Sequence, residues 1–204
     1  PWATPLAETV MALMAGNAAV LKPSELTPFT ALKIGEIFKK AGLPTGVLEI
    51  VTGDGSTGAA LVDAAVDKVM FTGSVETGKR VAEAAARHLT PLVLELGGKD
   101  PMIVFEDANL KNAARAAVWG AFCNAGQACA SIERCYVHES IAKEFINSVV
   151  NETVALKQGV PDSDNIDLGA MSNERQLKIV EDHITDAKVR GAQVLTGGKR
   201  LSEG

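Results

Sequence analysis

Short apolar runs alternate along the chain with segments whose apolar residues have helical spacing. In residues 27–41, for example, Ile34 and Ile37 lie on one face of a helix. This pattern predicts helices at residues 1–15, 27–41, 55–65, 74–88, 110–122, 141–156 and 174–190. The short apolar runs predict strands at residues 18–21, 47–51, 68–71, 91–96, 101–105, 134–137 and 192–195. Because strands and helices alternate without hairpin signals, we predict an α/β fold of parallel βαβ units with right-handed crossovers.

The alternation restarts at Gly97 and Gly98, where one apolar run ends and a new strand–helix pattern begins. We therefore predict two α/β units, residues 1–97 and residues 98–204. Within the second unit, a loop rich in glycine, proline, serine and aspartate is expected at residues 159–169.

The composition is that of a globular protein, since 47% of the 204 residues are hydrophobic and 22% are charged. A net charge of −5 without a basic stripe argues against a nucleic-acid partner. The apolar runs are too short to cross a bilayer, so no membrane segment is expected. Cys123, Cys129 and Cys135 lack a zinc-binding spacing, so no metal site is expected and a reducing, cytoplasmic setting is favoured.

Two short strings carry the candidate chemistry. A carboxylate at Glu95, among Val93, Leu94 and Leu96, is expected to be shielded from water. Such shielding raises the pKa of a carboxyl group and allows it to accept a proton. Cys129 stands among small residues, where a deprotonated thiol could act as a nucleophile. On residue type alone, a structural glutamate and an inert buried cysteine remain open alternatives.

Together, the two strings resemble the motifs of the aldehyde dehydrogenase superfamily. Glu-Leu-Gly-Gly-Lys at residues 95–99 is similar to the general-base motif of that family. Asn-Ala-Gly-Gln-Ala-Cys at residues 124–129 is similar to its nucleophile motif, at the family's separation. The resemblance implies a partial aldehyde dehydrogenase-like fold. Residues 1–97 would form the second half of the dinucleotide-binding domain, and residues 98–204 the first half of the catalytic thiol domain.

Two glycine-rich turns are candidate phosphate sites. Residues 53–58 match the Gly-x-Gly-x-x-Gly dinucleotide pattern between a strand and a helix, although a simple turn gives the same pattern. Residues 73–79 approach the P-loop pattern, but Arg80 stands where that loop needs a magnesium-binding hydroxyl. The sequence therefore argues against a nucleoside-triphosphatase site.

The family resemblance selects the second turn for the cofactor's pyrophosphate. It implies that Gly73, Ser74 and Gly78 face the pyrophosphate at the N-terminus of a helix. It assigns Gly55, in the first turn, to an adenine pocket.

The resemblance also implies a ribose site shortly after the first predicted strand. Lys22 is similar to a lysine that binds the adenosine ribose, and Glu25 is similar to an acid that binds ribose hydroxyls. An alternative for Glu25 is a structural acid at the start of a helix, where the helix dipole favours a negative charge. A carboxylate at Glu25 would repel a 2′-phosphate, so NAD is the expected cofactor, while Lys22 and Ser24 also admit NADP. The further cofactor residues implied are Leu96 and Gly97.

The resemblance implies a mechanism in which the Cys129 thiolate attacks an aldehyde and hydride passes to the nicotinamide. Glu95 then activates the water that hydrolyses the thioester to a carboxylic acid. One alternative is a CoA-acylating (semi)aldehyde dehydrogenase, which typically lacks this glutamate, and another is an inactive nucleotide-binding fragment. Lys99 is expected to hold the Glu95 segment, and Asn124 is expected to hold the Cys129 loop.

The sequence does not identify the aldehyde. Trp119 and Phe122 are the large side chains available as walls of a substrate site. Side chains expected in the core include Met102, Tyr136, Cys123 and Cys135.

The resemblance further implies that the chain is an internal piece of a longer enzyme. Pro1 is similar to the closing proline of a motif whose asparagine, half of the oxyanion hole, would lie just upstream. A later motif that holds the nicotinamide ribose would lie downstream. The implied partner is a small-molecule aldehyde, and the implied assembly of the full-length protein is a homodimer or homotetramer.

Overall fold

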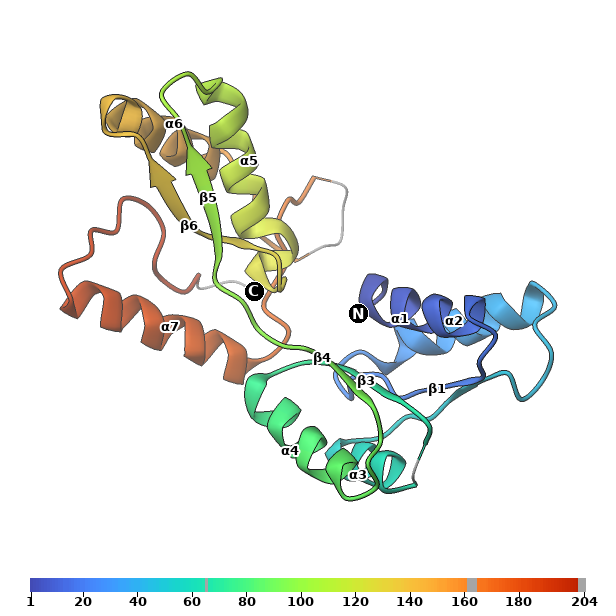
Figure 1. Cartoon of the computed structure of the whole chain (residues 1–204). Coiled ribbons are helices and arrows are strands. Elements are labelled where there is room, and N and C mark those ends of the chain that lie inside the picture. The colour runs from blue at the N-terminus through green and yellow to red at the C-terminus, as the bar shows by residue number, and fades with distance from the viewer. Residues whose placement is uncertain (65, 161–164, 202–204) are drawn as a thin grey trace. The chain divides into compact units, whose positions relative to one another are not determined.

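The computed structural model describes residues 1–64, 66–160 and 165–201. The chain divides into two compact units, Pro1–Gly97 and Gly98–Gly204. The prediction of an α/β fold with parallel strands is confirmed (Figure 1).

The first unit contains two parallel strand pairs with helices beside them. Its elements are α1 (Ala3–Met14), β1 (Ala19–Leu21), α2 (Pro28–Lys40), β2 (Leu48–Ile50), α3 (Gly55–Asp63), β3 (Val69–Thr72), α4 (Val75–Ala86) and β4 (Leu92–Glu95). Strand β1 pairs with β2, and β3 pairs with β4 so that Thr72 lies opposite Glu95. Helices α3 and α4 pack together beside the β3–β4 pair (Figure 1). The candidate cofactor residues therefore lie in the segments that directly follow the ends of these four strands.

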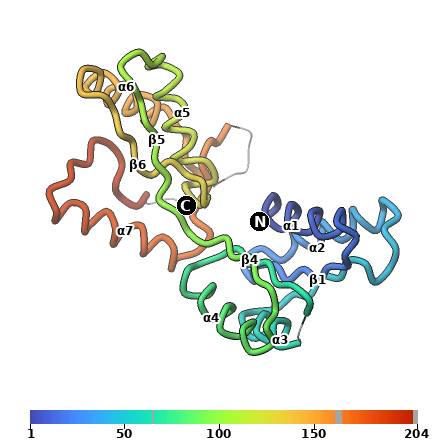
Figure 2. Tube along the Cα trace, viewed as in Figure 1, coloured from blue at the N-terminus to red at the C-terminus, as the bar shows by residue number. Residues whose placement is uncertain are grey.

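The second unit is built on one parallel pair, β5 (Asp100–Val104) and β6 (Ile132–Val137). Its other elements are α5 (Leu110–Phe122), η1 (Cys123–Gly126), η2 (Glu139–Ile141), α6 (Ala142–Val154) and α7 (Glu174–Val189). The trace in Figure 2 runs from β5 through α5 and η1 to β6. A core cluster of Val104, Ala117 and Phe145 joins β5, α5 and α6.

The predicted strand at residues 192–195 is wrong. A strand is stabilised by the ladder of a neighbouring strand, and in the described part of the chain this segment has none. Residues 193–196 instead line a cavity against α5, α6 and β6. Ala65, which ends a predicted helix, lies outside the described residues, and so does part of the predicted loop at 159–169.

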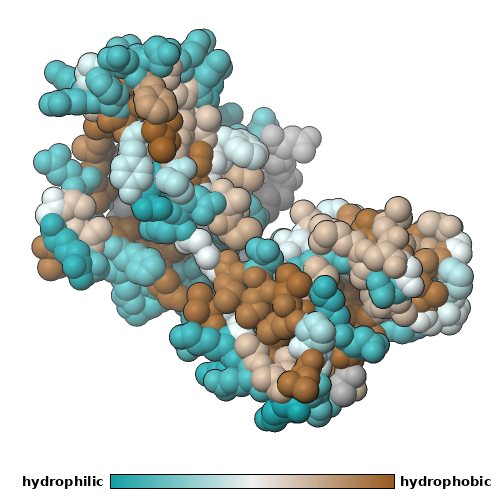
Figure 3. Space-filling view, viewed as in Figure 1, coloured by the Kyte–Doolittle hydropathy of each residue, from teal (hydrophilic) through white to brown (hydrophobic). Residues whose placement is uncertain are grey.

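Apolar side chains of β3 and β4 are only half-buried. In Figure 3 they form a brown area over these two strands. No helix in the described residues is both long enough and apolar enough to span a membrane.

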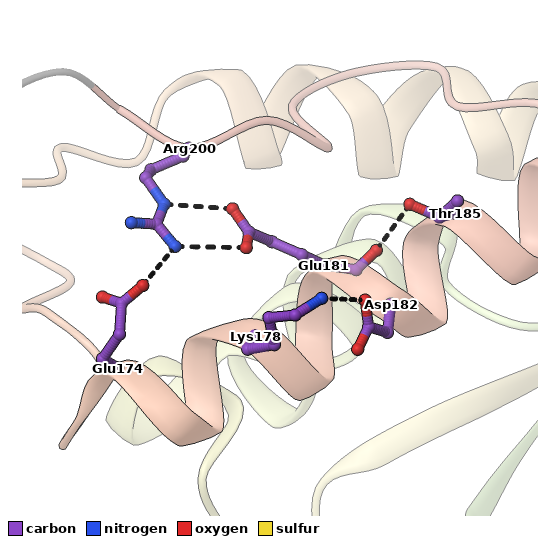
Figure 4. Close-up of polar contacts among 6 residues, drawn as sticks. All are labelled: Glu174, Lys178, Glu181, Asp182, Thr185 and Arg200. Atoms are coloured by element: carbon purple, nitrogen blue, oxygen red, sulfur yellow. Dashed lines mark hydrogen bonds and ion pairs between the residues drawn. The ribbon is translucent and has the colours of Figure 1, made fainter.

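A surface ion-pair network joins the segment after α7 back to that helix (Figure 4). The Arg200 guanidinium donates from Nε and Nη2 to both carboxylate oxygens of Glu181, at 3.0 and 3.1 Å, and from Nη2 to Glu174 at 2.7 Å. These hydrogen bonds, first those of Glu181 and then that of Glu174, raise the pKa of Arg200. A neighbouring pair, Lys178 and Asp182, lies at 2.6 Å on α7.

Candidate active site

Lys22 joins the two turns that follow β1 and β2. Its side chain is only 16% exposed, and its Nζ donates to the carbonyl oxygens of Pro23 at 2.7 Å and Gly53 at 3.0 Å. The Glu25 carboxylate lies 3.8 Å from the same ammonium. The carboxyl ends of neighbouring parallel strands meet at one edge of a sheet, which explains why residues 31 positions apart meet here. The structure thus brings the predicted ribose residues beside the first glycine turn.

The first glycine turn opens α3 with a well-formed cap. The Asp54 carboxylate accepts from Ser56 N at 2.9 Å and from Ser56 Oγ at 2.6 Å. These hydrogen bonds, the side-chain bond first, lower the pKa of Asp54. Gly55 is the first residue of α3, and a Cβ at this position would meet nothing within 4 Å. Ser24, the remaining residue of this group, accepts from Leu26 N at 3.3 Å.

The second glycine turn connects β3 to α4. Gly73 N donates to the carbonyl oxygen of Glu95 at 3.0 Å, so this turn lies against the end of β4. Ser74 is the N-cap of α4, with its Oγ accepting from Thr77 N at 3.2 Å. Gly78 is buried, and a Cβ there would lie 2.5 Å from Leu96 Cδ2. A glycine at 78 therefore allows the chain after β4 to approach α4 closely.

Glu95 ends β4, and its side chain is exposed, as is Gly97. The expectation that apolar neighbours shield Glu95 from water is therefore wrong. Glu95 is the last residue of a strand that has a single hydrogen-bonded partner in the described chain, so its apolar neighbours do not enclose it. An exposed carboxylate at this position is accessible to water.

Cys129 follows an unusual turn at the end of α5. Asn124 and Ala125 have φ of 55° and 57°, and Gly126 has φ of 72°. Such left-handed backbone costs about 1 kcal/mol or more for a residue with a Cβ. Strained backbone of this kind persists only where surrounding contacts over-determine it, and it clusters at functional sites. The Cys129 residue beyond the turn is exposed.

Side-chain amides brace this turn. Asn124 Nδ2 donates to the carbonyl oxygen of Gln127 at 3.0 Å, and Gln127 Nε2 donates to the carbonyl oxygen of Asn124 at 3.0 Å. The Gln127 Oε1 accepts from Ser172 N at 3.0 Å and from Ser172 Oγ at 2.7 Å. Sequence motifs did not identify Ser172, because it lies 45 residues beyond Gln127 in no recognisable pattern.

The start of the second unit lies against the Cys129 backbone. A Cβ on Gly98 would lie 3.1 Å from the Cys129 carbonyl oxygen. Lys99 is held on both sides, because its carbonyl oxygen accepts from Arg134 Nε at 2.8 Å and its Nζ lies 3.4 Å from Glu133. The end of the Glu-Leu-Gly-Gly-Lys string and the cysteine string are thus neighbours.

The expectation that Cys123 and Cys135 are core residues is wrong, since both are exposed. Cys135 lies on β6, paired with Met102 of β5. It also lines the cavity of about 380 Å³ formed with residues 193–196, and burial there raises the pKa of its thiol. Met102 packs against the core cluster as expected. Tyr136 does not, being 54% exposed beside Arg134.

Trp119 and Phe122 line a second pocket, of about 370 Å³, together with Cys123 and Asn124. Trp119 is 73% exposed, so a large apolar surface stands open beside the turn that precedes Cys129. In the described residues, no three His, Cys, Asp or Glu side chains gather in a way that could hold a metal ion.

Comparison with known proteins gives consistent matches over the whole chain. The model of the aldehyde dehydrogenase family matches residues 1–204. The 4,4'-diapolycopene aldehyde oxidase of Methylomonas sp is 45% identical over 208 residues, covering 100% of this chain and 38% of that protein. A putative succinate-semialdehyde dehydrogenase [NADP(+)] 2 of Mycobacterium tuberculosis is 45% identical over 203 residues, covering 98% of this chain and 39% of that protein.

Solved structures match equally well. Lactaldehyde dehydrogenase from Escherichia coli has a TM-score of 0.93 at 37% identity, covering 99% of this chain and 44% of that chain. A 3,6-anhydro-L-galactose dehydrogenase in complex with NAP has a TM-score of 0.87 at 41% identity, covering 95% of this chain and 41% of that chain. The chain thus spans less than half the length of these relatives.

Proposed function

The chain belongs to the aldehyde dehydrogenase family, and from this premise we propose that its protein oxidises an aldehyde to a carboxylic acid with NAD or NADP. We assign residues 1–97 to the cofactor-binding part and residues 98–204 to the part that carries the catalytic thiol. Cys129 is the proposed nucleophile, and Glu95 is the proposed general base.

The residues of the first unit fit a dinucleotide. The first N–H groups of a helix lack partners within the helix and attract phosphate, and Ser74, the N-cap of α4, directly follows Gly73. The Lys22 ammonium and the Glu25 carboxylate stand 3.8 Å apart, where they could donate to and accept from ribose hydroxyls. The relatives include a putative dehydrogenase named for NADP(+) and a structure in complex with NAP, so both NAD and NADP belong to the proposal. When bound, this cofactor supplies the oxidant for the substrate's carbonyl carbon.

Cys129 supplies the nucleophile. Its thiolate forms a carbon–sulfur bond to the aldehyde carbonyl carbon, which places the negative charge on the carbonyl oxygen. The backbone N–H of Cys129 can donate to that oxygen, and such a donor is worth about 3 kcal/mol in comparable sites. Oxidation of the adduct leaves a thioester on Cys129.

Glu95 completes the reaction by accepting a proton from water. The water oxygen attacks the thioester carbonyl, the carbon–sulfur bond breaks, and the products are a carboxylic acid and the Cys129 thiolate. An exposed Glu95 carboxylate is consistent with this role because the base must reach water. The observation that carries the proposal is an exposed thiol, held beyond a strained turn, whose backbone lies against Gly98 of the glutamate-bearing string.

The test uses the full-length protein that contains this chain, a panel of aldehydes, and NAD or NADP with and without CoA. We expect reduced cofactor and free carboxylic acid without CoA, and no turnover after Cys129→Ala. Cys123→Ala is the matched control and should retain turnover. Reduced cofactor formed by Cys129→Ala would refute the nucleophile, and product formed only with CoA would favour the acylating alternative.

A further inference from the structure

The turn before Cys129 needs supporting hydrogen bonds to keep its conformation. Three consecutive left-handed residues, Asn124, Ala125 and Gly126, make its backbone costly to maintain. Only Gly126 adopts a positive φ without a steric penalty. The conformation therefore depends on the hydrogen bonds that these residues make with the rest of the chain.

Gln127 provides the local contact. Its backbone N–H and its side-chain Nε2 both donate to the carbonyl oxygen of Asn124, at 3.2 and 3.0 Å. Its own carbonyl oxygen accepts from Asn124 Nδ2. The turn is thus closed by a reciprocal pair of side-chain amides, and this closure works only when the Gln127 NH₂ group faces the Asn124 carbonyl.

Ser172 determines which way the Gln127 amide points. A backbone N–H can only donate, so the Gln127 atom that lies 3.0 Å from Ser172 N must be the oxygen. The Ser172 hydroxyl donates to the same oxygen at 2.7 Å. With the oxygen held there, the amide NH₂ is directed at Asn124.

The position of Ser172 in the chain makes it a firm anchor. It directly precedes Asn173, the N-cap of α7, whose side chain accepts from Gln176 N at 2.9 Å. Helix α7 spans 16 residues, so the anchor is attached to a long element rather than to a free loop.

We propose that Ser172 is a positioning residue for Cys129, acting through the orientation of the Gln127 amide. This inference rests on the proposed function for its effect on turnover, but its effect on the turn is independent of any reaction. Well-oriented reactive groups depend on such support, because a displacement of about 1 Å can cost about 100-fold in rate.

The test compares Ser172→Ala, Ser172→Thr and Gln127→Glu in the full-length protein. Ser172→Ala removes the hydroxyl bond to Gln127 and keeps the backbone N–H bond, and we expect about fivefold lower kcat with an unchanged KM for the cofactor. Hydrogen–deuterium exchange should rise across residues 123–129. Ser172→Thr keeps the hydroxyl, so its kcat and its exchange at residues 123–129 should equal those of the unsubstituted protein. Gln127→Glu keeps the acceptor for Ser172 but cannot donate to Asn124, so it should raise exchange more than Ser172→Ala.

Ser140→Ala is the matched control, since it also removes one exposed serine hydrogen bond, to His138 Nδ1 at 2.8 Å. It should change neither exchange at residues 123–129 nor kcat. If Ser172→Ala leaves exchange or kcat at the level of Ser140→Ala, the positioning role of the Ser172 hydroxyl is refuted. If Cys129→Ala retains turnover, the proposed function fails, while the exchange data still decide whether Ser172 holds the turn.

Discussion

Two turns in this chain, one in each unit, are held by a side chain from a distant position, but by different means. The turn at Gly53–Gly55 is held by Lys22, whose ammonium donates to the Gly53 carbonyl oxygen from 31 residues upstream. The turn before Cys129 is held by Gln127, whose amide is anchored by Ser172 from 45 residues downstream. The first support uses a charge, and the second uses neutral hydrogen bonds.

Both turns contain a small residue with a positive φ, but one is a glycine and the other an alanine. At Gly53 the backbone has a φ of 156°, which residues with a Cβ rarely adopt, and a Cβ there would also lie 2.1 Å from Thr57 Oγ1. At Ala125 the need is for a left-handed backbone that alanine adopts only under constraint. The small residues of each turn and the distant residues that hydrogen-bond to it can therefore be tested by separate substitutions.

The largest stability effect is expected from Gly53→Ala. The new Cβ would collide with the Thr57 side chain on α3 and would strain a backbone with positive φ, so we expect the free energy of unfolding to fall by about 2 kcal/mol. Gly55→Ala is the matched control in the same turn, because a Cβ there meets nothing within 4 Å. Urea denaturation of both variants measures the difference. Equal stabilities would show that neither the positive φ nor the close approach of Thr57 explains the glycine at 53.

In the turn before Cys129, the reverse substitution of alanine by glycine should stabilise the protein. Ala125→Gly removes a left-handed alanine, and we expect the free energy of unfolding to rise by about 1 kcal/mol. Ala116→Gly, on the exposed face of α5, should lower it by about 1 kcal/mol. Thermal melting of the two variants gives the signs directly. A loss of stability in both would contradict the strain assigned to Ala125.

A smaller effect concerns the thiol that faces the cavity. Burial raises the pKa of Cys135 above its ordinary value of 9.0. A raised thiol pKa favours the folded state below pH 9.0, and this contribution is lost as pH rises further. Alkylation by iodoacetamide, followed by peptide mass spectrometry, should give a midpoint for Cys135 above 9.0. A midpoint at or below the ordinary value would show that the cavity does not shield this thiol.

The smallest effect is expected at the surface network of Figure 4. Arg200→Gln removes the pairs with Glu181 and Glu174, which are solvent-exposed and screened by salt. Hydrogen exchange of residues 192–200 should rise slightly at low salt and less at high salt. Lys33→Gln, which removes an exposed pair on α2, should leave that segment unchanged.

The sequence predicted most of the architecture because periodicity and glycine positions are local signals. Its strand at residues 192–195 was wrong because strand formation depends on a neighbour that local pattern cannot supply. The predictions that Glu95 and Cys135 are buried were wrong for the same reason, since burial depends on which elements pack against these residues. The motifs contain Cys129 and Gln127 but not Ser172, since a contact from a residue 45 positions away leaves no spacing to recognise. The assignments of Lys22, Glu25, Gly73 and Ser74 to a cofactor remain predictions.

The measurement that tests the central claim most directly is acid quenching of the full-length Glu95→Gln variant during reaction with an aldehyde and NAD. Glu95→Gln should form the thioester but hydrolyse it slowly, because the amide cannot accept the proton from water. Peptide mass spectrometry should then find one acyl group on the peptide that contains Cys129, and none in the double variant with Cys129→Ala. An acyl group on Cys123 or Cys135, or unimpaired acid release by Glu95→Gln, would contradict the account.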